Sequence, residues 1–366
     1  MMTALMNYLI DQQHQLDELA PTLEKLEWVA IDTEFLREKT YSAKLCLVQL
    51  GIGDNQYCID VLLIPDLTAL ANLLINPNTL KVFHAASQDL EVLYQTFGSV
   101  PNPIFDTQLA AAFCGADLQI GYAGLVEQVT QVVLDKGQSR TDWTVRPLST
   151  AQIRYAGEDV EYLWAVYENT REQIAEQGRL EWLEDEIAVL SNEDNYKSDP
   201  AQAYLRLSGG NLKRSAQYRL KALAEWRESY AQERNIPRTW VIKDPALYDI
   251  AVQNPKTPKA LLDMDVLGKK SGSRFAPQIV NLIRAAKTED NPIWRAVEPL
   301  SKADKRECQK LMQATTAIAK EQGVAQALLG TRKDIEHLYR HRQSKKLING
   351  WRQSVIGEPL LELLSS

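Results

Sequence analysis

Residues 28–35, WVAIDTEF, decide the fold, because they are typical of a buried strand that ends in two acids. The first four residues are continuously apolar, as expected of a central strand covered on both faces of its sheet. Asp32 and Glu34 are two positions apart, so they project from the same face of that strand. Neighbouring carboxylates at a buried strand end repel each other and lose hydration unless protons or cations compensate. A solvated strand end remains the more common explanation of an isolated Asp-x-Glu pair.

Asp89 lies in the run HAASQDLEVL, residues 84–93, where a short strand is followed by a helix. Ser87 is the expected N-cap of this helix, which places Asp89 in the first turn. An acid there stabilises the helix dipole by up to about 1 kcal/mol, so Asp89 alone does not indicate a site.

Tyr155 and Asp159 lie on a helix that begins with a capping box, Ser149 to Gln152. Residues four apart share one face of a helix, so the phenol and the carboxylate are neighbours. A solvated Tyr–Asp pair is the ordinary alternative.

Four carboxylates and a phenol from three elements together indicate metal-ion chemistry. Mg²⁺ prefers carboxylate oxygens and keeps waters for substrate phosphates. Two ions about 4 Å apart can hold both the attacking and the leaving oxygen of a phosphoryl displacement. The chain has only four histidines, and they form no cluster with these acids. The sequence therefore gives little support to a histidine-based metal site or a nucleophilic triad.

The composition is that of an ordinary globular protein, with 45% hydrophobic and 24% charged residues in a chain of 366. This length predicts two or three domains. No apolar run approaches the roughly 18 residues of a membrane helix, and the absence of Lys or Arg before Lys25 argues against a signal peptide. The four cysteines show no C-x-x-C spacing. They predict buried free thiols in a reducing cytoplasm, not disulfides or a zinc site.

The net charge of −7 is unevenly distributed. Residues 205–290 hold 16 Lys and Arg against 9 Asp and Glu, and residues 291–366 hold 13 against 8. Residues 1–204 hold 12 against 31. A basic second half favours nucleic-acid binding, although a chance asymmetry between solvated helix faces explains the charge equally well.

Three blocks follow from the pattern along the chain. Residues 1–190 alternate short strands with helices, which predicts an α/β domain with a mixed sheet. Its expected strands are residues 28–35, 44–52, 56–59, 80–83 and 104–105, the second and third forming a hairpin. Residues 191–209 are the expected linker. Two all-α modules are expected at residues 210–288 and 293–366, and their similar size suggests a duplication.

Start and stop signals support this helical reading of the second half. Asp244 and Thr257 each precede a proline and are expected N-caps. Ser301 is expected to begin a long helix that Gly323 ends.

The motifs resemble those of a known family. Asp32-Thr-Glu34, Asp89 and Tyr155-x-x-x-Asp159 are similar to the motifs of DEDD exonucleases of the tyrosine subtype, and the surrounding runs resemble the ribonuclease D family. These runs are IDTEF, HAASQDLEVL, IFDTQLAAAFCG, LDKGQSRTDWTVRPLS and YAGEDVEYL. The resemblance spans essentially the whole chain and implies an RNase H-like exonuclease domain. Both helical modules resemble HRDC domains, the first more clearly than the second.

The resemblance implies a 3′→5′ exoribonuclease with two divalent ions, Mg²⁺ or Mn²⁺, that releases nucleoside 5′-monophosphates. Asp32 would bridge both ions, Glu34 and Asp159 would complete the site of the ion that activates water, and Asp89 would support the other ion. An unperturbed phenol has a pKa of about 10, so Tyr155 suits orienting the water better than acting as the base. The implied partner is RNA, with tRNA precursors as the expected substrates. We expect a cytoplasmic monomer without an organic cofactor or a membrane anchor.

Further residues are candidate substrate contacts. Phe35 could stack on a base, worth about 1–3 kcal/mol, although a core position is as plausible. His84 fits a hydrogen-bonded strand-end histidine better than a substrate contact. A basic and aromatic loop precedes the tyrosine helix and could receive the RNA backbone, although a packed tryptophan with solvated charges is the alternative. Its residues are Lys136, Arg140, Trp143 and Arg146.

Two other functions remain open. One is a DNA exonuclease, because DNA exonucleases use the same acidic motifs. An enzyme distinguishes RNA from DNA by contacts to the 2′-hydroxyl, and no single residue of the sequence identifies such a contact. The second alternative is a catalytically inert RNA-binding scaffold. The presence of all four acids and of the tyrosine argues against it.

Overall fold

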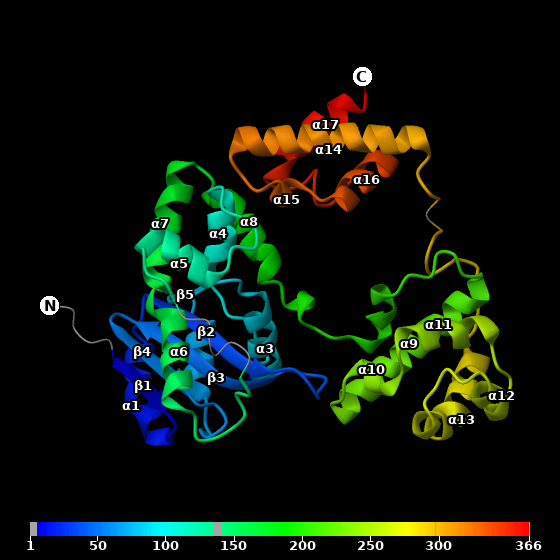
Figure 1. The fold of residues 1–366 in the computed structure, drawn as a ribbon, viewed down its shortest axis with the longest axis horizontal. Helices are drawn as coiled ribbons and strands as arrows, with labels where there is room; N and C mark the ends of the chain where they lie inside the picture. Colours follow the sequence, from blue (N-terminus) through cyan, green and yellow to red (C-terminus); the bar gives the residue numbers. More distant parts are fainter. Residues whose placement is uncertain (1–5, 135–140, 297, 366) are drawn as a thin grey trace. The chain divides into compact units, whose positions relative to one another are not determined.

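The computed structural model describes residues 6–134, 141–296 and 298–365 (Figure 1). The chain divides into two compact units. The first contains Met1–Leu36, Leu45–Tyr196 and Leu300–Ser366, and the second contains Arg37–Lys44 and Lys197–Pro299. Among the described residues, no helix is long and apolar enough to cross a membrane.

A six-stranded mixed sheet with the order β1-β4-β3-β2-β5-β6 forms the centre of the first unit. The strands are β1 (Met6–Ile10), β2 (Trp28–Leu36), β3 (Lys44–Ile52), β4 (Asn55–Ile59), β5 (Leu80–Phe83) and β6 (Ile104–Asp106). Strands β3 and β4 form the predicted antiparallel hairpin, whereas β2 pairs with β5, β5 with β6 and β1 with β4 in parallel. The sequence reasoning missed β1, which adds a parallel edge to β4.

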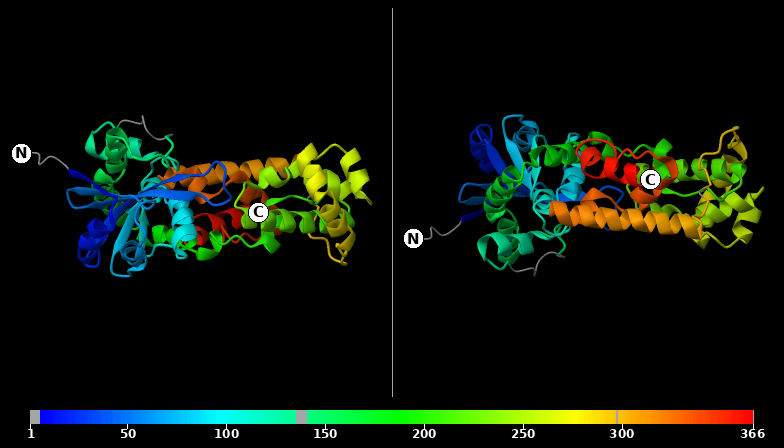
Figure 2. Two further views of the ribbon diagram at one scale, coloured as in Figure 1. Left: turned by 90° about the horizontal axis from the view of Figure 1, so that it is seen from below. Right: turned by 90° about the horizontal axis from the view of Figure 1, so that it is seen from above.

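Helices cover both faces of this sheet. They are α1 (Gln13–Leu23), α2 (Thr68–Ile75), α3 (Ser87–Phe97), α4 (Thr107–Phe113), α5 (Tyr122–Thr130), α6 (Thr150–Glu161), α7 (Leu163–Glu176) and α8 (Leu180–Leu190), followed by a short 3-10 turn, η1 (Glu193–Asn195). Figure 2 shows α1, α2 and α3 on one side of the sheet and α5 and α6 on the other. Strand β2 is therefore central, and its apolar residues Val29, Ala30 and Ile31 are almost completely buried, as predicted.

Asp106 fixes the ends of two helices. Its carboxylate caps α4 by accepting hydrogen bonds from the amides of Gln108 (2.8 Å) and Leu109 (3.2 Å). It also accepts from the amides of Ala85 (3.1 Å) and Ala86 (2.9 Å), which lead into α3. The prediction that Ser87 caps α3 is wrong, because Ser87 is already helical and the carboxylate from β6 takes the capping role. Asp106 thereby holds the start of the helix that carries Asp89.

The C-terminal helices pack onto the nuclease part of the first unit. They are α14 (Lys302–Gln322), α15 (Gln326–Leu329), α16 (Arg332–His341), the π-helical turn η3 (Gln353–Gly357) and α17 (Glu358–Leu363). Trp351 stacks on Trp182 of α8, with ring centroids 4.6 Å apart, and meets Phe113 of α4 edge-on at 5.3 Å. As predicted, Ser301 caps α14 and Gly323 ends it in the left-handed conformation.

The second unit is helical. Its elements are η2 (Pro200–Arg206), α9 (Arg214–Arg234), α10 (Arg238–Val241), α11 (Asp244–Gln253), α12 (Pro258–Asp263) and α13 (Lys269–Ala285). Thr257 caps α12 as predicted. The prediction for Asp244 is wrong, because this residue is the first of α11 and its carboxylate instead pairs with the buried Arg227.

A buried carboxylate organises part of this unit. Glu228 accepts hydrogen bonds from Arg206 (2.9 Å), Arg238 and Tyr41. Burial alone would raise the pKa of Glu228, but the bonds from Arg238, Tyr41 and Arg206 outweigh burial and lower it to about 2.

The four cysteines are free thiols, as predicted, and three of them are buried while Cys114 is half-buried.

Gly51 of β3 permits the close approach of α6 to the sheet. A Cβ atom at this position would lie 2.8 Å from the carbonyl oxygen of Val160 and 3.0 Å from the Cβ of Ala30. Neither atom belongs to a flexible side-chain end, so a larger residue would push α6 outward.

We predict that Gly51→Ala lowers the free energy of unfolding by about 1–3 kcal/mol, the usual cost of overpacking, and lowers nuclease turnover as well. Urea unfolding followed by circular dichroism and a nuclease assay measure the two effects. Gly124→Ala is the matched control, because the nearest atom to its added Cβ lies 3.8 Å away. Unchanged stability of Gly51→Ala would show that α6 can shift without cost.

Candidate active site

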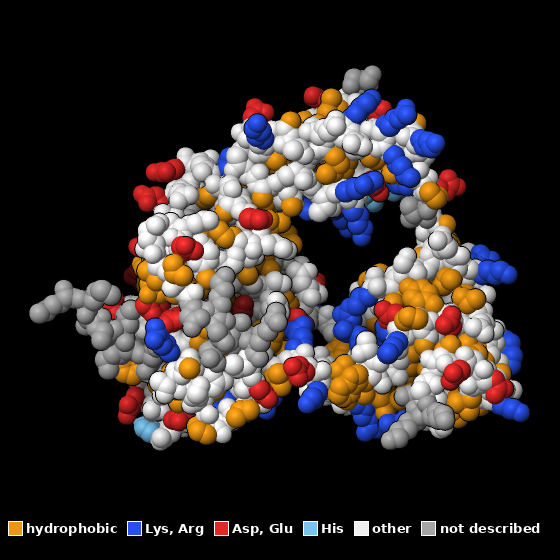
Figure 3. Space-filling model, viewed as in Figure 1, with side chains coloured by type: hydrophobic (Ala, Val, Ile, Leu, Met, Phe, Trp, Pro, Cys, Tyr) orange, Lys and Arg blue, Asp and Glu red, His pale blue; other side chains and the backbone are white. Residues whose placement is uncertain are grey.

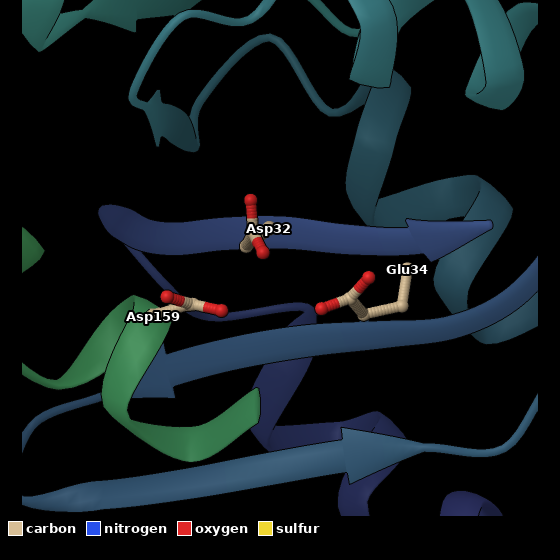
Figure 4. Close-up of side chains that lie close together, drawn as sticks. All are labelled: Asp32, Glu34 and Asp159. Atoms are coloured by element: carbon tan, nitrogen blue, oxygen red, sulfur yellow. The ribbon is translucent and has the colours of Figure 1, made fainter. Parts of the chain in front are cut away.

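Three carboxylates converge where β2 meets α6. Figure 4 shows Asp32 and Glu34 on β2 and Asp159 on α6 turned toward one another. One oxygen from each lies within 4.8 Å of the others. They line a cleft of about 230 Å³, together with Thr33, His84, Tyr122, Tyr155 and Leu163.

Local structure explains how α6 brings Asp159 to the strand. The predicted capping box at Ser149 is present, with Gln152 bonded in return to the Ser149 amide at 3.0 Å. Arg146, just before the helix, pairs with the buried Asp60 through two bonds, of 2.5 and 2.8 Å. The same guanidinium donates to the Cys46 carbonyl of β3 at 3.1 Å. The start of α6 is therefore tied directly to the sheet.

Asp89 lies beside these three carboxylates but is turned toward the strand. It is buried in the first turn of α3, as predicted, and accepts a hydrogen bond from the hydroxyl of Thr33. Its charge still acts on Asp32 and Glu34 by raising the pKa of both. Thr33, which the sequence reasoning did not single out, holds Asp89 from the middle of the Asp-x-Glu motif.

Burial and mutual repulsion make the cluster hold protons when no cation is bound. Desolvation, followed by repulsion from Asp89, Asp159 and Glu34, raises the pKa of Asp32 well above its ordinary value. Desolvation and repulsion raise the pKa of Glu34 to about 9. The pKa of Asp89 and that of Asp159 are each raised to about 7, chiefly by desolvation. Close carboxylates that resist ionisation are the donor set that a hard divalent cation suits, so these residues fit such ions.

Tyr155 is hydrogen-bonded to Asp159, the residue one turn along the same helix. Burial and the surrounding carboxylates raise the pKa of Tyr155 above its ordinary value. Without bound metal the phenol therefore keeps its proton at neutral pH, which favours a hydrogen-bonding role over that of a base.

His84 and Tyr122 form another wall of the cleft. His84 is hydrogen-bonded to Thr107 (2.9 Å) and to the carbonyl of Ile120 (3.0 Å), as expected of a strand-end histidine, and its ring also lines the cleft. Tyr122 was missed by the sequence reasoning, because its run Gly121-Tyr122-Ala123 has no motif that marks a site.

The remaining predicted substrate contacts have different surroundings. Trp143 is buried at 2% exposure, so the packed alternative describes it better than a surface that receives RNA. The donors of Arg146 are used by Asp60 and by backbone carbonyls, which leaves this side chain a structural role. Phe35 is half-buried on β2 and is not among the described residues that line the cleft. Lys136 and Arg140 lie outside the described residues.

Comparison with family models matches a 3′-5′ exonuclease model at residues 8–175 and an HRDC domain model at residues 217–283. Ribonuclease D of Granulibacter bethesdensis is 37% identical over 97% of this chain and 92% of its own length. Ribonuclease D of a Jannaschia species is 38% identical over 92% of this chain and 90% of its own.

Two solved structures are also similar. Ribonuclease D of Escherichia coli, described as an exoribonuclease involved in structured RNA processing, matches with a TM-score of 0.90 at 30% identity. The match covers 98% of this chain and 99% of that one. The catalytic core of RRP6 from Trypanosoma brucei matches at 0.59 and 23% identity over 78% and 81%, which shows a shared fold.

We predict that divalent ions stabilise the protein more strongly as pH rises. The carboxyl pKa values are raised in the folded state, so without metal their stabilising contribution is complete below about pH 4 and is lost as pH rises through about 7 to 9. Bound ions replace the protons and reverse this loss. The shift in melting temperature on adding Mn²⁺ should therefore be larger at about pH 8 than at about pH 6.

Asp32→Asn separates this effect from non-specific ion binding. At about pH 8 the variant should melt at a higher temperature than the native chain without metal and gain less from Mn²⁺. Asp54→Asn, at an exposed turn, is the matched control and should behave like the native chain. An equal response of Asp32→Asn and the native chain to Mn²⁺ would contradict the metal assignment.

Proposed function

The chain belongs to the ribonuclease D family, and on this premise we propose that Asp32, Glu34, Asp89, Tyr155 and Asp159 carry out its catalysis. The chain is a 3′→5′ exoribonuclease, a hydrolase with an exonuclease domain and an HRDC domain. The observation that carries the assignment of residues is the convergence of Asp32, Glu34 and Asp159, whose oxygens lie within 4.8 Å of one another.

The exonuclease fold implies divalent metal ions. We propose that the four carboxylates would hold two of them: Asp32 would contribute to both, Glu34 and Asp159 to one, and Asp89 to the other. When bound, such ions neutralise phosphate charge and lower the pKa of a coordinated water. Asp89 would have to exchange its bond from the Thr33 hydroxyl for a ligand role. Either Mg²⁺ or Mn²⁺ suits these oxygens.

Tyr155 is assigned to orienting the attacking water. As a protonated phenol held against Asp159, it presents a fixed hydroxyl at the edge of the cleft. Hydrolysis of the 3′-terminal phosphodiester then releases a nucleoside 5′-monophosphate. His84, which also lines the cleft, is proposed as a contact of the terminal nucleotide.

We propose structured RNAs, tRNA precursors among them, as the substrates. The solved relative from Escherichia coli is described as acting in structured RNA processing. Figure 3 shows Lys and Arg side chains gathered over α14–α17. Lys333 and Lys345 are exposed and could contact phosphates, whereas Arg219 is bonded to the carbonyl of Ala251 and is structural. Action as a monomer in the cytoplasm, and an HRDC-like identity for residues 293–366, remain predictions.

We predict that Asp32→Asn and Asp159→Asn each abolish release of 5′-mononucleotides from a 3′-extended tRNA, because each removes a ligand charge from the carboxylate cluster. A time course with Mn²⁺ omitted and restored, resolved by chromatography of the products, measures this. Asp54→Asn again serves as the control. Native turnover in either site variant would exclude the mechanism.

Tyr155→Phe should lower kcat by about 10²–10⁴-fold, the range typical of a lost proton-handling group, while metal binding is retained. Calorimetric titration with Mn²⁺ alongside the nuclease assay separates the two quantities. Loss of metal binding in this variant would mean that Tyr155 supports Asp159 and does not orient water.

RNA should be degraded faster than DNA of the same sequence, because the 2′-hydroxyl is the group that distinguishes them. Parallel assays with matched oligonucleotides test this preference, and faster degradation of DNA would overturn it.

A further inference from the structure

The helix that carries Tyr155 and Asp159 is interrupted three residues after Asp159. Helix α6 ends at Glu161 and α7 begins at Leu163, and Tyr162 between them has φ −101° and ψ 0°. An uninterrupted helix would bond the amide of Tyr162 to the carbonyl of Glu158, four residues earlier. Interruptions of this kind have a specific cause, such as proline or a polar group inserted between the two backbone partners.

The hydroxyl of Tyr122 is the inserted group. It donates a hydrogen bond to the carbonyl oxygen of Glu158 at 3.2 Å and accepts one from the amide of Tyr162, also at 3.2 Å. A phenol can donate once and accept at the same time, so one side chain bonds to both backbone groups that the interruption separates. The amide of Tyr162 also donates to the carbonyl of Val160.

We propose that Tyr122 is a positioning residue for the metal site, because its hydroxyl holds the α6–α7 helix open beside Asp159. The inference rests on the proposed role of Asp159 as a metal ligand. Glu158, whose carbonyl the hydroxyl holds, immediately precedes Asp159, so this bond sets the rotation of the last turn of α6.

Tyr122 is itself held from the opposite side of the cleft. His84, at the end of β5, is hydrogen-bonded to the carbonyl of Ile120, two residues before Tyr122. The rings of His84 and Tyr122 lie 5.7 Å apart. His84 is in turn fixed by Thr107 at the start of α4. The segment that leads into Tyr122 is thus bonded to His84 after β5, which is bonded in turn to Thr107 after β6.

The two halves of the helix pack on different partners, which is why the interruption matters. Helix α6 must approach β3 at Gly51, where the Val160 carbonyl leaves no room for a Cβ. Helix α7 is fixed elsewhere, with Trp164 stacked on Trp28 at 3.6 Å and Tyr167 edge-on to Phe105 at 4.8 Å. A direct hydrogen bond between the Glu158 carbonyl and the Tyr162 amide would make the orientation of Asp159 depend on how α7 packs. With the Tyr122 hydroxyl inserted between these two groups, α6 and α7 can each take the orientation that its own partners require.

Tyr122→Phe tests the proposal, because it keeps the ring in the cleft and lets Glu158 and Tyr162 bond to each other. Calorimetric titration of the full chain with Mn²⁺ should show a Kd about tenfold higher or more, as expected for loss of a group that orients a ligand. In the nuclease assay kcat should fall at limiting Mn²⁺ and recover in part at high Mn²⁺. KM for an RNA oligonucleotide should stay within about twofold, since no substrate contact is lost.

Tyr196→Phe is the matched control. It also removes one phenolic hydroxyl from a backbone carbonyl, that of Leu190 at 2.8 Å, away from the cleft. It should lower the melting temperature without changing the Kd for Mn²⁺.

The outcomes separate the proposal from its premise. A native Kd for Mn²⁺ in Tyr122→Phe, with only a lower melting temperature, would overturn the positioning role, as would a raised KM for RNA at unchanged metal affinity. Asp159→Asn is titrated in parallel. If it too binds Mn²⁺ like the native chain, the assignment of Asp159 fails, whereas loss of binding in Asp159→Asn alone means that only the inference about Tyr122 fails.

Discussion

The repulsion among carboxylates gathered at the end of β2 is the constraint on which the rest of the first unit depends. Desolvation and like charge raise the pKa of Glu34 to about 9 and that of Asp159 to about 7. A folded chain would relieve this repulsion by letting the strand end and the helix separate, unless other contacts hold them together. Those contacts therefore determine whether a cation finds its ligands already assembled, which is the condition for tight and specific binding.

The contacts that resist separation come from uncharged or fully paired groups. Asp106 accepts four hydrogen bonds from backbone amides at the starts of α3 and α4. Arg146 and Asp60 compensate each other and join the start of α6 to the sheet. Because Asp60 is satisfied by its partner, it adds structure near the cleft without adding an unpaired negative charge. Gly51 brings α6 close by lacking a side chain. The acids with a structural role, Asp60 and Asp106, are therefore different residues from the acids that are available to bind metal.

The features of the fold that depend on residues close together in the sequence could be predicted. The β3–β4 hairpin, the capping box of α6 and the boundaries of α14 each depend on neighbouring residues, so the sequence predicted them correctly. The sequence also indicated which acids would converge, because side-chain direction on a strand and a helix follows from spacing. It did not indicate β1, whose pairing with β4 is set by residues far away in the chain. Ser87 was misassigned for the same reason, since Asp106 of a different strand performs the capping. Thr33 and Tyr122 act through contacts of long sequence separation that no local pattern encodes.

The C-terminal helices show what a helical pattern leaves open. Periodicity shows that one face of a helix is buried, but not the surface against which it packs. Residues 300–366 pack with the nuclease sheet in one unit, where Trp351 stacks on Trp182 and donates from its indole nitrogen to Glu186 at 3.0 Å. Arg352 pairs with the same carboxylate and donates to the Leu328 carbonyl at 2.8 Å. Exposed lysines on α16 and after it therefore belong to the same compact unit as Asp32. If they bind phosphates, as proposed above, these helices would take part in selecting the RNA whose 3′ end reaches the cleft.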